Sequence, residues 1–149
     1  QYYIIITSLE LDPAEMEKRN IHLQKKYAEI EENEVRFEEL HCEDAEYLIV
    51  AFGSCARIAQ KAMEMAREEG IKVGLLRPIT LWPFPSKAIA ARAAQVKGIL
   101  TVELNAGQMV EDVRLAVECK VPVEHFGRLG GIVPDPDEVI TALKEKLIK

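Results

Sequence analysis

Cysteine and histidine are scarce in this sequence, and neither residue type is clustered. The sequence contains three cysteines and three histidines: Cys42, Cys55, Cys119, His22, His41 and His125. None of them is part of a CxxC, HxxxH or HxxE motif. Iron–sulfur and zinc sites need closely spaced thiolates or imidazoles. We therefore expect no metal site in this chain, and we expect its thiols to be unpaired, as in cytosolic proteins.

Long apolar runs and an excess of basic residues are also missing. No apolar stretch approaches the roughly 20 residues that cross a bilayer, and the net charge is −6. We therefore expect neither a membrane span nor a nucleic-acid-binding face. Residues 1–6 lack the basic leader of a secretion signal, so a cytoplasmic location is expected. The first residue is Gln1 rather than Met, which suggests a piece of a longer chain.

The sequence does contain enough apolar residues for one core, because 48 % of its 149 residues are hydrophobic. A continuous apolar run, typical of a buried parallel strand, lies at 47–52, further strands are expected at 73–76, 98–103 and 121–126, and a period-2 segment lies at 35–40. Helices are expected between them, at about 13–31, 54–69, 86–94, 107–119 and 136–147. This alternation predicts an α/β fold with a mostly parallel sheet of four or five strands, covered by helices on both faces.

The first expected helix differs from the others. Asp12 and Pro13 form a helix start signal, but the helix that follows is rich in charge and has only a ragged apolar stripe. Such helices are usually solvated connectors or pack weakly on a neighbour. We therefore divide the chain into a linker with a connector helix, residues 1–34, and a compact domain, residues 35–149.

Four loops follow predicted strands, and ligands of parallel sheets bind beyond the carboxyl ends of the strands. The first loop has the composition of an anion site. Gly53 permits the turn, Ser54 would be the N-cap of the helix, and Arg57 would clamp a phosphate or carboxylate. The same residues are also ordinary strand-to-helix turn chemistry, and both interpretations stand. GxGxxG and GxxxxGK[ST] motifs are absent, which disfavours a dinucleotide or Walker-type site.

The second loop, residues 77–85, holds three prolines and two large aromatic residues. Stiff backbone and apolar side chains suit a docking surface for another subunit. Trp82 and Phe84 would equally suit a loop folded back over the domain's own core. The candidate interface residues are Leu81, Trp82, Phe84 and, from the third loop, Met109.

The third and fourth loops carry polar groups and adjacent glycines. The candidates for ligand binding are Glu103, Asn105 and Gln108 in the third loop and Arg128, Gly130 and Gly131 in the fourth. Asn105 would alternatively cap the next helix, and the two glycines would alternatively form a flexible turn. No serine or cysteine stands at a motif spacing from a base, so no catalytic residue is predicted.

Taken together, these loops carry a family resemblance. Segments 53–57, 74–85, 102–109 and 127–131 resemble, in order and spacing, the C-terminal domain of the alpha subunit of 2-oxoacid:ferredoxin oxidoreductases of the branched-chain (2-oxoisovalerate) or 2-oxoglutarate type. The resemblance covers about residues 35–149. It implies a three-layer α/β/α domain, similar to the transketolase C-terminal domain, with a mixed five-stranded sheet whose first strand, at 35–40, is antiparallel.

The resemblance also implies a function. The parent enzymes oxidatively decarboxylate a 2-oxoacid to an acyl-CoA and pass the electrons to ferredoxin. Their thiamine diphosphate, Mg²⁺ and iron–sulfur clusters belong to other domains or subunits, so no cofactor is expected here. This domain would serve assembly with subunits of the beta, gamma and delta type, or as a homodimer. Two alternatives remain: the matching domain of a transketolase or of a 2-oxoacid dehydrogenase beta subunit, and a stand-alone small-ligand-binding α/β module.

Overall fold

The computed structural model of the protein describes residue 9 and residues 11–148. The chain divides into two compact units, residues 1–34 and residues 35–149, and the division falls where the sequence pattern changes. Each unit is described by itself. Residues 1–8 and 10, at the start of the predicted linker, lie outside the described residues, as does residue 149.

The first unit contains helix α1 (Pro13–Asn33). Asp12 is its N-cap, and the Asp12 carboxylate accepts a hydrogen bond of 2.8 Å from the backbone N–H of Ala14. Pro13 stands at the first helical position, where a missing N–H costs nothing. None of the helix residues is buried, as its charge-rich sequence indicates. No helix among the described residues is long and apolar enough to cross a membrane.

The second unit is an α/β domain built on one five-stranded sheet, as predicted. The strands lie in the order β1-β3-β2-β4-β5; β1 is antiparallel to β3, and the other neighbours are parallel. The elements are β1 (Phe37–Leu40), β2 (Tyr47–Ala51), α2 (Gly53–Glu68), β3 (Val73–Pro78), α3 (Ser86–Ala93), β4 (Ile99–Glu103), α4 (Met109–Val117), β5 (Val123–Gly127) and α5 (Pro136–Leu147). The antiparallel first strand and the three-layer class are therefore confirmed.

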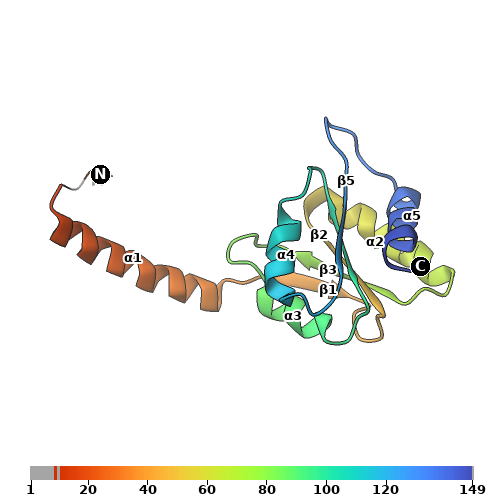
Figure 1. The fold of residues 1–149 in the computed structure, drawn as a ribbon, viewed down its shortest axis with the longest axis horizontal. Helices are drawn as coiled ribbons and strands as arrows, with labels where there is room; N and C mark the ends of the chain where they lie inside the picture. The colour runs from red at the N-terminus through yellow and green to blue at the C-terminus, as the bar shows by residue number, and fades with distance from the viewer. Residues whose placement is uncertain (1–8, 10, 149) are drawn as a thin grey trace, which may run out of the picture. The chain divides into compact units, whose positions relative to one another are not determined.

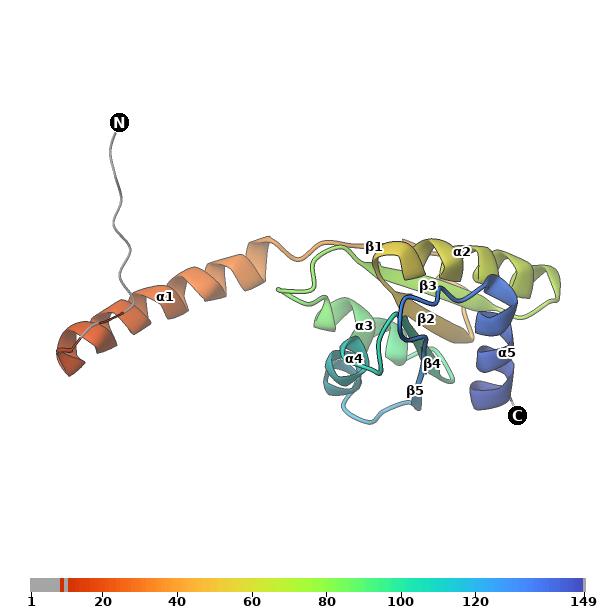
Figure 2. The ribbon, with the colours of Figure 1, turned by 90° about the horizontal axis from the view of Figure 1, so that it is seen from above.

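Helices cover both faces of the sheet. Helices α2 and α5 lie on one face, and helices α3 and α4 lie on the other (Figure 2). Each face has its own apolar cluster: Ile49, Leu75 and Leu100 face α2 and α5, whereas Leu48 and Val50 face α3 and α4. Successive residues of a strand point to opposite faces, so a strand buried on both sides reads as a continuous apolar run. This arrangement explains why the apolar runs predicted the strands.

Several element boundaries differ from the expectation, three of them for a clear physical reason. Strand β3 continues to Pro78, which pairs with Phe37 at the end of the antiparallel ladder, where a proline is tolerated. Strand β5 begins at Val123, after a proline, rather than at residue 121. Helix α4 begins at Met109 rather than 107, because Gly107 has a φ of +109°, which no helical residue adopts.

The carboxyl ends of β2, β3, β4 and β5 lie along one edge of the sheet, and β1 begins at the same edge because it is antiparallel. The sheet is strongly twisted, so the loops of this edge point in different directions. Figure 1 shows the loop after β3 at the left of the domain and the loop after β5 at its top. The edge therefore presents separate surfaces rather than one pocket.

Candidate functional site at the carboxyl ends of the strands

Glu103, the last residue of β4, is completely buried, with 0 % exposure. Its carboxylate accepts hydrogen bonds from three successive backbone N–H groups at the start of α4: Gln108 at 3.2 Å, Met109 at 2.8 Å and Val110 at 3.1 Å. A helix N-terminus has unpaired amides and a partial positive charge. Glu103 thus supplies the anion that this helix end attracts, from within the same chain.

This geometry corrects two predictions. Glu103 was a candidate ligand residue, but its two oxygens are engaged with backbone donors and none of its surface is exposed. Asn105 does not cap α4; its side-chain oxygen accepts from the N–H of Gly107 at 2.7 Å, before the helix begins. The N-cap is Gln108, without a side-chain capping bond. The α4 N-terminus is therefore no site for an external anion.

His125 on β5 lies against the same carboxylate, although no sequence pattern had singled it out. Its Nδ1 is 3.3 Å from Glu103 Oε1 and 3.2 Å from Thr101 Oγ1. The Thr101 hydroxyl also lies 3.3 Å from the carbonyl oxygen of Glu124, to which it donates. In the parallel pairing of β4 with β5, Thr101 lies opposite His125. Knowledge of this strand register would have identified His125 as a neighbour of the site.

Gly127 allows the β4–α4 loop to pass close over β5. A Cβ at this position would lie 2.2 Å from the backbone oxygen of Asn105 and 2.6 Å from Nε2 of His125. Both neighbours are closer than any real Cβ contact, and one of them is backbone. The loop, the imidazole and the buried carboxylate are therefore held as one unit, and any side chain at Gly127 would force them apart.

The start of α2 differs from the expected anion site in one respect. Ser54 lies inside the helix rather than at its N-cap, which is Phe52 and has no side-chain capping bond. The reason is that Gly53 turns with a φ of +57° and is itself the first helical residue. Ser54 and Arg57 are both exposed. The first-turn amides thus have no side-chain acceptor here, in contrast to those of α4.

Residues of the fourth loop are only partly available to a ligand. Arg128 Nη1 lies 3.3 Å from Glu138 Oε1, and Glu138 also belongs to the capping box of α5 with Asp135. The Nε of Arg128 is buried without a hydrogen-bonding partner. Gly130 and Gly131 have positive φ angles, and no atom of the described residues would contact an added Cβ at either. They form an open turn, and nothing described in this chain approaches them.

The thiols are separate and poorly suited to bind metal. Burial raises the pKa of Cys42 to about 11, and burial together with the charge of Glu103 raises the pKa of Cys55. Cys119 is exposed. Metal binding needs a thiolate, which raised pKa values disfavour. Within the described part of the chain, no group of three or more His, Cys, Asp or Glu residues could hold a metal ion.

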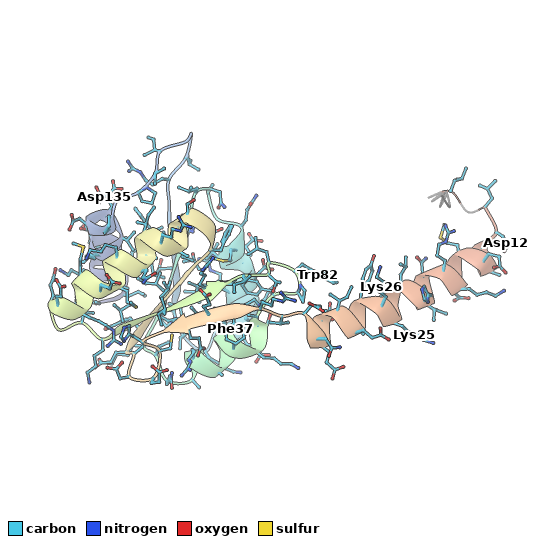
Figure 3. The ribbon with its side chains drawn as sticks, turned by 180° about the vertical axis from the view of Figure 1, so that it is seen from behind. Asp12, Lys25, Lys26, Phe37, Trp82 and Asp135 are labelled. Carbon is cyan, nitrogen blue, oxygen red and sulfur yellow. The ribbon has the colours of Figure 1, made fainter. Side chains whose placement is uncertain are left out.

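The apolar loop after β3 divides between core and surface. Trp82 is 54 % exposed and Leu81 is 47 % exposed, so the loop does not bury its tryptophan in the domain core (Figure 3). Phe84 is half-buried and packs against the α3/α4 cluster. Met109 is only 4 % exposed, because it begins α4 with its side chain in the same cluster. Met109 is therefore removed from the candidate interface.

Comparison with known proteins decides the family. A family model described as pyruvate:ferredoxin oxidoreductase core domain II matches residues 45–139. The chain belongs to this family. The ketoisovalerate oxidoreductase subunit VorB of Methanothermobacter marburgensis is 46 % identical to it over 141 residues, which are 95 % of this chain and 40 % of that subunit. The 2-oxoglutarate synthase subunit KorA of the same organism is 33 % identical over 101 residues, which are 68 % of this chain and 27 % of that subunit.

Solved structures agree with this core domain II assignment. A 2-oxoglutarate:ferredoxin oxidoreductase from Magnetococcus marinus, solved with 2-oxoglutarate, coenzyme A and succinyl-CoA bound, matches with a TM-score of 0.78 and 25 % identity, over 91 % of this chain and 24 % of that chain. A split-gene transketolase matches with a TM-score of 0.65 and 21 % identity, over 76 % of this chain and 41 % of that chain, which shows the shared fold. The chain spans less than half the length of the relatives that it matches. The resemblance to 2-oxoacid:ferredoxin oxidoreductases is confirmed.

Proposed function

We propose that this chain is the core domain II part of a subunit of a 2-oxoacid:ferredoxin oxidoreductase, and that the substrate is a branched-chain 2-oxoacid. The supporting observation is the 46 % identity to VorB across 95 % of the chain, against 33 % over 68 % for KorA. The complete enzyme would convert a 2-oxoacid and CoA into acyl-CoA, CO₂ and a proton. The two electrons released would reduce two ferredoxins. Its proposed location is the cytoplasm.

The role proposed for this domain is assembly rather than chemistry. Thiamine diphosphate would require a site for its diphosphate, but at the start of α4 the Glu103 carboxylate already takes the helix amides. Iron–sulfur clusters would require clustered thiolates, whereas Cys42 and Cys55 are buried with raised pKa values. Neither the start of α4 nor the buried thiols therefore fits these groups. We assign them to other parts of the enzyme, and we derive no catalytic step here.

A chimaeric subunit tests this function. The segment of the M. marburgensis VorB subunit that matches this chain is replaced by it, and the complex is assembled with its companion subunits. We expect CoA-dependent reduction of methyl viologen by 2-oxoisovalerate, with 2-oxoglutarate a poorer substrate. The subunit lacking the segment is the control for assembly. A chimaeric complex that assembles but oxidises no 2-oxoacid contradicts the proposal.

The isolated chain supplies the complementary test. After anaerobic reconstitution with iron and sulfide it should stay colourless, and it should oxidise no 2-oxoacid with an artificial acceptor. An iron–sulfur absorption band that grows in proportion to the chain would refute the assignment of the clusters to other parts of the enzyme.

A further inference from the structure

We draw no further inference here: the strongest candidate, the apolar surface of the loop after β3, where Ile79 and Leu81 are exposed, carries none, because nothing in the described residues shows which partner would cover it.

Discussion

Replacing Glu103 by Gln exchanges one carboxylate oxygen of a fully buried side chain for an NH₂ group and leaves the size of the side chain nearly unchanged. The two carboxylate oxygens accept from three backbone N–H groups, and Oε1 also lies 3.3 Å from His125 Nδ1. A glutamine amide has only one oxygen, so in either orientation its NH₂ group faces backbone donors. We therefore expect Glu103→Gln to destabilise the domain by leaving buried donors without an acceptor.

The size of the destabilisation follows from two effects: a buried donor loses its acceptor, and the helix N-terminus loses a negative charge. A buried donor left without an acceptor costs about 1–3 kcal/mol, and a carboxylate at a partly buried helix N-terminus contributes up to about 2 kcal/mol. Since the losses share the same groups, we expect the unfolding free energy to fall by about 2–4 kcal/mol. That is a large part of the roughly 5–15 kcal/mol typical of a domain. Because m is about 1–3 kcal/mol per molar urea, the urea midpoint should fall by roughly 0.7–4 M.

Urea denaturation followed by circular dichroism measures this change, and amide exchange at residues 108–110 localises it. Glu111→Gln is the control, because Glu111 is an exposed acidic residue in the first turn of the same helix; its loss should cost less than about 1 kcal/mol. The role assigned to Glu103 is refuted if the unfolding free energy of Glu103→Gln lies within about 0.5 kcal/mol of the wild-type value and the amides of residues 108–110 stay protected from exchange.

Four further predictions follow from burial and charge. Trp82→Ala should change the unfolding free energy by less than about 1.5 kcal/mol, because the side chain is 54 % exposed; a loss of about 3–5 kcal/mol, typical of a core aromatic, would contradict its surface position. Native chain at pH 8 should be alkylated at Cys119 alone, as mass spectrometry would show, since Cys42 and Cys55 are buried with raised pKa values. Because unfolding returns the pKa of Cys42 from about 11 to its ordinary 9.0, stability measured by urea should fall as the pH rises through this interval. Phosphate at tens of millimolar should shift the NMR signals of residues 53–57, and Arg57→Ala should weaken the effect; absent shifts would argue against anion binding at the uncapped start of α2.

The layered fold could be predicted from the sequence, because a strand buried on both faces of a sheet consists of consecutive apolar residues. The run at 47–52 became β2, and Asp135 with Pro136 began α5 as expected. Antiparallel β1 came from the family resemblance, since its period-2 pattern carries no information on direction. Strand ends were less certain: β3 runs on through Pro78 because β1 lies beside it, which no local pattern shows.

The candidate site was less predictable, because its contacts depend on how the loops are folded. Glu103 reads as an ordinary polar residue at a strand end, and only the path of residues 104–108 brings the helix amides to its carboxylate. His125 joins it through the pairing of β4 with β5. Met109 was placed on the surface because it was counted as the end of the third loop, whereas it begins α4 with its side chain in the α3/α4 cluster. Trp82 was open to two interpretations, and its exposure of 54 % in the structure removes the core interpretation.

The buried Glu103 carboxylate also limits how the gene can vary. The five residues 104–108 must bring the chain from β4 back over its own strand end so that three successive amides reach one side chain. An inserted or deleted residue there would carry the helix out of register with the acceptor. The turn at Gly130 and Gly131 has no such constraint, because no atom of the described residues would contact a Cβ added at either glycine. Among relatives, insertions and deletions should therefore be rare between β4 and α4 and common between β5 and α5.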